Sequence, residues 1–277
     1  MNDHAKPPVP LFHAPGEPVL RGINWVGVRT LYLKEVRRFF KVQLQAVWAP
    51  AVTTLLFLAI FLVALGGIKR EVLGVPYGSF LAPGLIMMAL AQNAFQNSLS
   101  SLIIGKVQGT IIDVLMPPLS VREVIFCFVA AAVTRGWAVG LAVWGAMALW
   151  PGVSVSIASL PLVLVFGTLA GVLLGLMGVL TGLWADKFDH GAAVTNFVVQ
   201  PLTLLSGTFY AIDRLPQSIQ AISRANPFFY MIDGFRAGFI GVAEADPWTG
   251  IAVVGGLCVV LWVAAHFALK TGWKVKA

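Results

Sequence analysis

One apolar stretch of the chain carries a row of polar side chains that could form hydrogen bonds. They recur at i, i+1, i+4, i+5, i+8 and i+9, and they are Gln92, Asn93, Gln96, Asn97, Ser100 and Ser101. At 100° per residue they occupy about half of the circumference of a helix. Hydrocarbon cannot satisfy amide groups, so this face must meet protein or water. We expect it either to line a pathway or to hydrogen-bond to a neighbouring helix.

Motifs of common catalytic and nucleotide-binding sites are absent from the sequence. No GxxxxGK(S/T) phosphate loop occurs, since Gly105-Lys106 has neither the earlier glycine nor the following Ser or Thr. No GxSxG or HExxH motif occurs, and no pair of carboxylates falls within an apolar run. We therefore expect no enzyme activity and no cofactor bound by this chain, so that any energy from ATP must arrive through a partner.

Cysteines and histidines indicate neither a disulfide framework nor a metal site. Cys127 and Cys258 each stand inside an apolar run, where cysteine behaves as a small buried hydrophobic residue. The four histidines, at positions 4, 13, 190 and 266, are scattered without the spacing of metal ligands. We expect no metal site.

Arg135 is the only charged residue deep inside an apolar run. The run ends at Trp150, and the residues between would form roughly 22 Å of helix. Arg135 would then sit only several ångströms inside the edge of a hydrocarbon core of about 30 Å. Its long stem could snorkel outward, or its charge could be functional. The sequence leaves both alternatives open.

The composition identifies the class of protein. Of the 277 residues, 58% are hydrophobic and 11% are charged, whereas a soluble domain carries about 25% charged residues. This excess of apolar surface predicts an all-α polytopic membrane protein. The net charge of +7 would suggest a nucleic-acid partner in a soluble protein. Here we expect the basic residues to meet anionic lipid at the membrane surface, with no nucleic-acid partner.

Six apolar runs are each near or above the roughly 20 residues needed to cross the bilayer. They cover about 46–66, 80–104, 124–150, 160–184, 192–212 and 249–269. The first run begins too late for the apolar part of a signal peptide, so we expect no cleavable signal. An even number of spans places both termini on one side. Lys and Arg are more frequent on that side, which predicts cytoplasmic N- and C-termini.

Two segments precede the first span. Residues 1–23 are rich in proline and predict a disordered tail. Residues 24–45 predict an amphipathic helix whose apolar side includes Val28, Phe39 and Phe40 and whose charge includes Arg37 and Arg38. Such a helix lies in the plane of the membrane interface. The alternative is a simple extension of the first span. Residues 24–277 then form a single transmembrane domain.

The loop at 105–123 predicts a short apolar helix followed by a capped one. Gly105 and Gly109 interrupt the chain, and Pro117-Pro118 must end any helix before it. Ser120 and Glu123 have the spacing of a capping box. On the predicted topology the apolar turn is cytoplasmic, so it should dock into a partner. The alternative is an ordinary turn.

The segment 205–241 is too broken to be a span and too apolar to be a solvated loop. Leu215, Ile219 and Ile222 predict a short amphipathic helix, and Asn226-Pro227 predicts a turn. In the apolar part that follows, Asp233 and Arg236 stand at i and i+3 and could pair. Neither half is long enough to cross, so we expect a re-entrant helical hairpin at the outer leaflet. The alternative is a plain periplasmic loop.

Gly167, Gly171 and Gly175 lie on one face of the fourth predicted span. Such a row of small residues lets another helix approach closely. It could serve packing within the chain, or it could form an interface with a second subunit.

These features together resemble the type-2 ABC transporter permeases, the membrane subunits of bacterial ABC exporters such as those for polysaccharides, lipo-oligosaccharides and drugs. Gly109-Thr110, a short helix, Pro118-Leu119-Ser120 and Glu123 are similar to the coupling loop of that family. The order of elements in 205–241 is similar to the segment before its last span. The likeness covers nearly all the chain from residue 24 onward.

The resemblance implies a function and a set of partners. It implies export of an amphipathic substrate, such as a lipid-linked glycan, a lipid or a hydrophobic drug, across the bacterial inner membrane. It implies two ABC ATPase subunits, which hold ATP and Mg, and a second copy of the permease or a paralogue. Two other functions stay open, namely a secondary transporter or channel and a membrane scaffold subunit. Ion coupling would call for acidic residues in the spans, and the predicted spans contain none.

The resemblance also implies roles for particular residues. Those expected to couple to the ATPase are Gly109, Thr110, Ile111, Ile112, Asp113, Leu115, Pro118, Glu123, Arg37 and Arg38. Those expected in a pathway or interface are Gln92, Asn93, Gln96, Asn97 and Gly171. Those expected at an outer re-entrant gate are Asp213, Pro227, Asp233 and Arg236.

Overall fold

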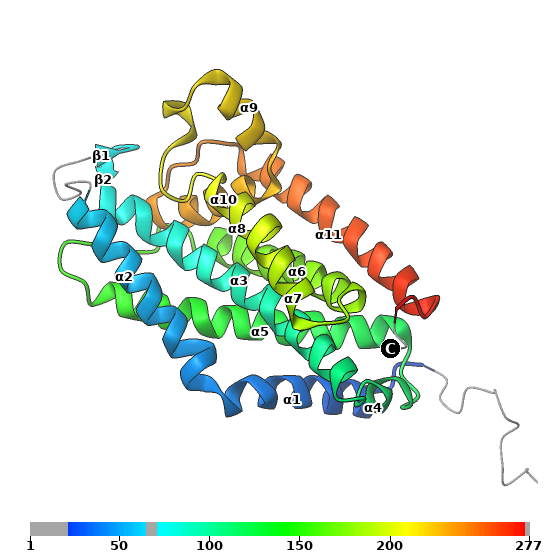
Figure 1. Cartoon of the computed structure of the whole chain (residues 1–277). Coiled ribbons are helices and arrows are strands. Elements are labelled where there is room, and N and C mark those ends of the chain that lie inside the picture. Colours follow the sequence, from blue (N-terminus) through cyan, green and yellow to red (C-terminus); the bar gives the residue numbers. More distant parts are fainter. Residues whose placement is uncertain (1–21, 65–70, 275–277) are drawn as a thin grey trace, which may run out of the picture.

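A computed structural model of the chain describes residues 22–64 and 71–274. Most of the predicted tail, residues 1–21, lies outside this range. The α-helices are α1 (Trp25–Lys41), α2 (Ala49–Ala64), α3 (Tyr77–Val107), α4 (Ile112–Leu115), α5 (Val121–Ala148), α6 (Leu160–Trp184), α7 (Phe188–Val194), α8 (Gln200–Leu204), α9 (Gln217–Ala225), α10 (Pro227–Ile240) and α11 (Pro247–Lys270) (Figure 1). The mostly helical fold confirms the predicted class.

Three shorter helical segments and one hairpin complete the described chain. Two π-helical segments, η1 (Leu44–Trp48) and η2 (Thr195–Val199), continue into α2 and α8 respectively. A 3₁₀ turn, η3 (Ile212–Arg214), precedes α9. Strands β1 (Glu71–Val72) and β2 (Val75–Pro76) pair antiparallel, with Val72 opposite Val75.

Five helices within the described residues are long and apolar enough to cross a membrane. They are the η1–α2 helix (Leu44–Ala64), α3, α5, α6 and α11. Their bounds lie within a few residues of five of the predicted spans. The predicted span at 192–212 differs: α7, η2 and α8 form a run of 17 residues over 188–204. This run is about 25 Å long.

The run ends eight residues earlier than expected because the chain turns at Gly207. That glycine has a φ of +74°, in the left-handed region that favours glycine. Thr203 carbonyl oxygen accepts hydrogen bonds from the hydroxyls of Ser206 and Thr208, which closes the turn. The predicted boundary at residue 212 is therefore wrong. That this run crosses the membrane, as the fifth of six spans, stays a prediction.

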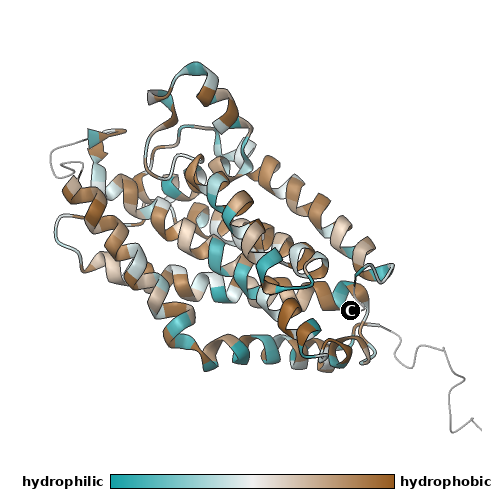
Figure 2. Ribbon diagram, in the orientation of Figure 1, coloured by the Kyte–Doolittle hydropathy of each residue, from teal (hydrophilic) through white to brown (hydrophobic). Residues whose placement is uncertain are grey.

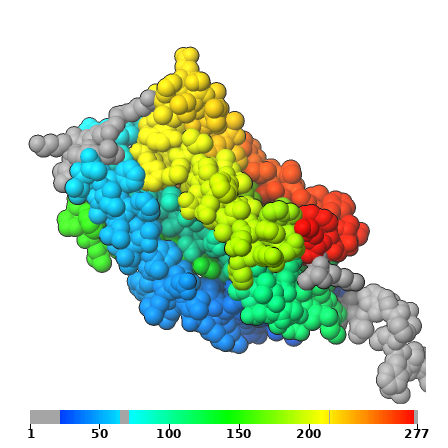
Figure 3. Space-filling model, viewed as in Figure 1, coloured from blue at the N-terminus to red at the C-terminus, as the bar shows by residue number. Residues whose placement is uncertain are grey.

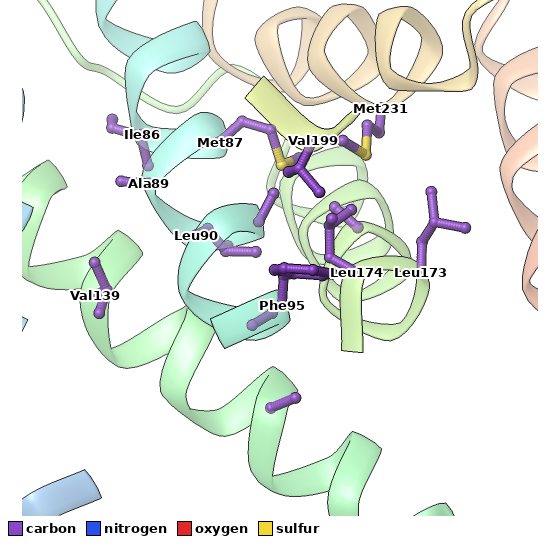
Figure 4. Packing of buried hydrophobic residues seen from close by; sticks show 14 of the residues in the cluster. Ile86, Met87, Ala89, Leu90, Phe95, Val139, Leu173, Leu174, Val199 and Met231 are labelled. Atoms are coloured by element: carbon purple, nitrogen blue, oxygen red, sulfur yellow. The ribbon is translucent and has the colours of Figure 1, made fainter. Parts of the chain in front are cut away.

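Helix α3 is the centre of the bundle. It packs against α5 and α6 over most of its length, and against α2 and α10 over shorter stretches. Figure 4 shows Phe95 of α3 beside Leu174 of α6, with Leu90 on the same helix as Phe95, Leu173 on the far side of α6, and Met231 of α10 nearby. α2 and α11 lie at the periphery and expose much of their apolar surface, seen in brown in Figure 2.

Close approach between α3 and α6 depends on glycine. A Cβ at Gly178 would lie 2.4 Å from the backbone oxygen of Phe95, and one at Gly182 would lie 2.8 Å from Leu102 Cβ. No side chain fits at such distances without moving the helices apart. The glycines of α6 thus fix how near the two central helices can pack.

Helix α1 lies across one end of the bundle, and the chain then bends upward into α2 (Figure 1). We call this end, which carries α1 and α4, the basal end, and the opposite end, which carries α9, the apical end. α1 buries Val28, Leu31 and Phe39 against α5. Phe40 is half exposed, contrary to its predicted place on the apolar side. The described chain begins and ends at the basal end, as an even number of crossings requires.

Candidate functional site

The polar residues of α3 lie along the bottom of a groove, where Gln92 and Asn93 line a cavity and Asn97 is buried. We call Gln92, Asn93, Gln96, Asn97 and Ser100 the polar floor. Figure 3 shows α3, in teal, at the bottom of a hollow between α2, in blue, and the α7–α8 run, in yellow-green. Between α2 and α3 this hollow includes a cavity of about 330 Å³, lined by Gln45, Thr53, Thr54, Gln92 and Asn93 among others.

One wall of the groove is hydrogen-bonded to the floor. Gln96 Nε2 donates to Thr195 Oγ1 of η2 at 3.2 Å. A π-helical segment stands on each side of the floor, η1 below α2 and η2 between α7 and α8. Such segments are often found at functional sites. The sequence left a pathway and an interhelical contact open. The structure shows the interhelical contact at Gln96 and a cavity beside Gln92 and Asn93, and the role of this face as a pathway stays a prediction.

Two arginines reach the polar floor from other helices. Arg38 of α1 donates to Ser100 Oγ at 3.1 Å and to the backbone oxygen of Asn97 at 2.8 Å. Arg135 of α5 donates through Nη2 to Asn93 Oδ1 at 3.1 Å. Arg135 therefore turns into the bundle, and the structure favours a buried charge over outward snorkelling.

Arg38 also forms an ion pair that the sequence analysis did not predict. Its Nε lies 3.1 Å from Glu35 Oε2, and Glu35 is only 1% exposed. The spacing of i and i+3 on α1 allows this pair. Arg38 is therefore turned inward and away from the outer surface where the resemblance placed it. Its neighbour Arg37 is exposed, as expected.

The coupling turn predicted at 105–123 is present as one turn of helix, α4. Gly109 has a φ of +72°, which allows the chain to reverse after α3. Thr110 and Asp113 are exposed beside it, as is Pro118. Val114 is buried and anchors the turn. Ile111 is half-buried beside Gly105, so it contributes less to the outer surface than predicted.

Three large apolar side chains project from this turn without cover in the described chain. Ile112 is 55% exposed, Leu115 is 46% exposed and Met116 is 75% exposed. We call these three residues the apolar knob. An exposed apolar cluster at a polar surface is typical of a protein–protein contact.

The coupling turn is joined to α1 by a set of short hydrogen bonds. The predicted capping box is confirmed: Glu123 Oε2 accepts from Ser120 N at 2.6 Å, and Ser120 Oγ accepts from Glu123 N at 3.3 Å. The other carboxylate oxygen, Oε1, accepts from the backbone N–H of Asn24 at 2.7 Å. Asn24 Nδ2 donates to Pro118 O at 3.3 Å. These bonds tie the turn to the start of α1.

Asn24 has a second role at this joint. Its Oδ1 accepts from Gly27 N at 3.0 Å and so caps α1. An asparagine directly before an amphipathic helix is a recognisable N-cap pattern. That signal could have placed Asn24 at the start of α1, although not its contact with Pro118, which is 94 residues away.

At the apical end, α9 and α10 are consecutive helices separated by Asn226. Asn226 Oδ1 caps α10 by accepting from Phe228 N at 3.0 Å, and its Nδ2 donates to Leu202 O at 2.7 Å. Pro227 occupies the first turn of α10, where its missing N–H costs nothing. α10 has 14 residues, about 21 Å, and is buried among α3, α6 and α11.

Asp233 and Arg236 form no direct ion pair among the described residues, although their charges lie close enough to interact, because each side chain has other partners. Asp233 accepts from the backbone N–H groups of Glu244, at 3.0 and 3.1 Å, and Ala245, at 2.9 Å. Arg236 donates to Gly207 O at 2.5 Å, and its Nη1 lies 3.9 Å from Glu244 Oε2. The reason is that the turn after α10 folds back over the helix and offers donors that sequence spacing alone does not reveal.

Asp233, Arg236 and Glu244 form an apical cluster, and Glu244 is the member that the sequence analysis missed. Its Oε1 accepts from Ile212 N at 2.8 Å, and the Arg236 guanidinium stacks on Phe80, 3.9 Å from the ring centre. Burial raises the pKa of Glu244, an effect that the nearby Arg236 charge opposes. Asp213, by contrast, is exposed and pairs with Arg224 at 3.3 Å, outside the cluster.

The comparisons with known proteins agree with this architecture. The ABC-2 type transporter family matches residues 27–240, which is most of the chain. The chain belongs to the ABC-2 type transporter family. It is similar to the inner membrane transport permease YadH of Escherichia coli K12, with 33% identity over 250 residues that cover 90% of this chain and 97% of the relative.

A second relative is more distant. Nodulation protein J of Rhizobium leguminosarum bv. viciae is 28% identical over 257 residues, which cover 90% of this chain and 93% of that protein. This ABC-2 permease is thus a membrane transport subunit, and its apolar helices and the name of the first relative support a multi-pass inner-membrane protein. The matched range takes in α1, the coupling turn, the polar floor and α10.

Gly171 of the permease faces the same chain. A Cβ there would lie 3.1 Å from Val133 Cγ2 and 3.3 Å from Val133 Cα on α5. Gly175 likewise meets Ala132. The structure therefore favours packing within the chain over the subunit interface as the role of this glycine face.

Proposed function

We propose that this permease is the membrane-spanning half of an ATP-driven exporter that moves an amphipathic substrate out of the cytoplasm. It would work with two ABC ATPase subunits, which bind ATP and Mg and hydrolyse the nucleotide. A second copy of the chain, or a paralogue, would complete the transporter. Members of this family generally work with an ATPase partner, and the apolar knob of Ile112, Leu115 and Met116 is a surface suited to one.

The observation that carries the proposal is a continuous connection from this knob to the polar floor. The coupling turn is bonded to the start of α1 through Glu123 and Asn24. Four turns along the same helix, Arg38 is bonded to α3 at Asn97 and Ser100. A push on the knob would therefore be delivered to the polar face of the central helix. Rigid elements joined by such contacts can carry a displacement between distant sites.

The mechanism follows from this connection. Closure of the ATPases would move the coupling turn and α1 together, and Arg38 would pull α3 relative to the α7–α8 run. The hydrogen bond between Gln96 and Thr195 joins the polar floor to the α7–α8 wall and is weak enough to exchange. The groove would then open towards the apical end.

The groove suits a substrate with both polar and apolar parts. The polar floor offers amide and hydroxyl groups, while Phe57 of the neighbouring helix α2, which is 40% exposed and lines the cavity, offers an apolar surface. A lipid-linked glycan, a lipid or a hydrophobic drug would place its polar part on the floor and its apolar part against α2. Two copies facing each other would enclose such a path.

The proposed topology has six crossings, with both termini in the cytoplasm. The α7–α8 run of about 25 Å would be the fifth crossing, accommodated by local thinning of the bilayer or by snorkelling at its ends. The basal end, with the exposed Arg37, would face the cytoplasm. α9 and α10 would form a re-entrant hairpin at the outer leaflet, and the cluster of Asp233, Arg236 and Glu244 would hold its outer gate together.

Purification from the native membrane tests the proposal. A tagged chain in mild detergent should bring down an ABC ATPase, and ATP-dependent transport in inside-out vesicles should be blocked by vanadate. A secondary transporter would transport without the ATPase and without sensitivity to vanadate. A scaffold subunit would bring down other membrane proteins and would support no transport.

A further inference from the structure

Arg135 carries a charge that nothing in the described chain neutralises. Its one hydrogen-bond acceptor is the neutral amide oxygen of Asn93, and it forms no ion pair with any described residue. The nearby carboxylate on α1, Glu35, is already paired with Arg38. Ionisable groups within membrane helices are costly and mark functional sites by default, with a partner of opposite charge.

Two hydrogen-bond donors at this place have no acceptor. The Nε of Arg135 and the Nδ2 of Asn97 are both buried and unpartnered among the described residues. Asn97 itself is 0% exposed. Arginine has only donors, and the Nδ2 of asparagine is likewise a donor. Buried polar groups are nearly always satisfied, so both atoms call for an acceptor that the chain does not supply.

Asn97 belongs to the polar floor, and Arg135 reaches the floor through its hydrogen bond to Asn93. An acceptor could therefore arrive through the groove. Asn93, which holds Arg135, also lines the cavity between α2 and α3. Arg135 is itself only half-buried. Figure 3 shows part of α3 open from this side, between α2 and the α7–α8 run.

We propose that Arg135, together with Asn97 and Arg38, forms a binding site for the oxyanion headgroup of an amphipathic cargo, a phosphate group in the first instance. The guanidinium fork matches the geometry of phosphate oxygens and makes strong charge-assisted hydrogen bonds. Arg38 and Glu35 cancel each other, so Arg135 supplies the net positive charge. The apolar part of the ligand lies against α2. The inference rests on the proposed function in one respect, which is that the bound ligand is the transported substrate.

Binding can be measured without the ATPase and without transport. The purified chain in an uncharged maltoside detergent is titrated with phosphatidic acid and, separately, with diacylglycerol of the same acyl chains, which lacks the phosphate. Native mass spectrometry then gives the dissociation constant of each lipid. We expect phosphatidic acid to bind about tenfold more tightly, since one charge-assisted contact is worth about that factor. Equal affinities for the two lipids would overturn the proposal.

Variants locate the site. Arg135→Gln should remove the preference for phosphatidic acid, while Arg135→Lys, which keeps the charge, should retain most of it. The double variant Arg29→Gln/Lys270→Gln removes two exposed basal cations, one on α1 and one at the end of α11, neither of which lines the cavity between α2 and α3, and should leave the preference unchanged. A preference that survives Arg135→Gln but is lost in the double variant would place the lipid on the surface and contradict the inference.

Three controls keep the outcome decisive. Arg135→Gln must unfold within a few degrees of the wild type, and recovery of the preference by lysine shows that charge, not shape, is responsible. Inorganic phosphate at the same concentration should fail to displace phosphatidic acid; equal displacement would mean a free-phosphate site and would overturn the assignment to a lipid headgroup. If no ATPase is found but the preference depends on Arg135, the exporter proposal fails and this site stands.

Discussion

The apolar knob offers a direct way to break the proposed coupling without disturbing the membrane domain. The double variant Ile112→Asp/Met116→Asp places two charges on side chains that are 55% and 75% exposed in the isolated chain. Because these side chains already face outward, the change should leave the helices and their insertion intact. Docking of the ATPase should be lost.

The size of the effect follows from the exposed fractions. Full burial of an Ile or Met side chain stabilises by about 1.5–3 kcal/mol, and roughly half to three-quarters of that remains to be gained on docking. The two substitutions together then cost about 2–4 kcal/mol per docking site, before any cost of burying a carboxylate. This corresponds to binding that is weaker by roughly 30-fold to 1,000-fold.

The assay is a titration of the co-purified ATPase onto the permease held in lipid nanodiscs. A conservative variant, Ile112→Leu/Met116→Leu, keeps the apolar surface and should bind within about threefold of the wild type. The Asp variant should show the same yield in the membrane and the same thermal unfolding as the wild type. An Asp variant that binds as tightly as the Leu variant would refute the assignment of this surface.

Three further predictions concern other parts of the chain. Arg38→Ala should leave ATPase docking unchanged but lower the transport obtained per ATP hydrolysed several-fold, measured in reconstituted vesicles, because the bonds from α1 to Asn97 are lost. Gly178→Ala should destabilise the permease by about 1–3 kcal/mol or more in thermal unfolding, whereas Gly256→Ala, with open space around its Cβ, should be neutral or slightly stabilising. In Glu244→Gln, the free energy of unfolding should fall less steeply with rising pH than in the wild type. Burial raises the pKa of Glu244 above its ordinary value of 4.5, so the folded chain holds this proton more tightly than the unfolded chain, and stability falls as pH rises from 4.5 through the raised value.

A steeper pH dependence in Glu244→Gln than in the wild type would contradict the assigned burial. Equal stability in the two glycine variants would contradict the close packing of α3 on α6. Loss of docking in Arg38→Ala would show that Arg38 acts at the ATPase surface and not at the polar floor.

Much of the fold could be predicted from the sequence because the strongest signals are local. Long apolar runs gave five helices within a few residues of their bounds. The spacing of Ser120 and Glu123 predicted a capping box that the structure contains. The amphipathic segment before the first span proved to be α1. In each case the physical cause, burial or capping, acts over a few neighbouring residues.

The parts that escaped prediction depend on contacts between distant segments. Glu35 lies on the buried side of α1 because Arg38 pairs with it, which an apolar pattern does not show. Asp233 bonds to the turn at Glu244 and not to Arg236 because the chain folds back after α10. The early end of the fifth apolar run follows from the turn at Gly207, whereas hydropathy continues past it.

Only part of the candidate site could be predicted from the sequence, for the same reason. Helical spacing placed Asn93 and Asn97 on one face, and the structure confirms that they share it. The arrival of Arg38 and Arg135 at this face depends on how α1 and α5 pack around α3. Such convergence has no signature in a single sequence, because the residues are separated by 42 positions or more along the chain.

The central claim is that this permease is driven by a partner ATPase. Native mass spectrometry of the tagged chain, purified from its own membrane in mild detergent, tests that claim most directly. The account predicts an assembly of two permease chains and two ABC ATPase subunits that loses the ATPase in Ile112→Asp/Met116→Asp. A chain recovered without any ATPase, or with one that the Asp variant retains at full occupancy, would contradict it.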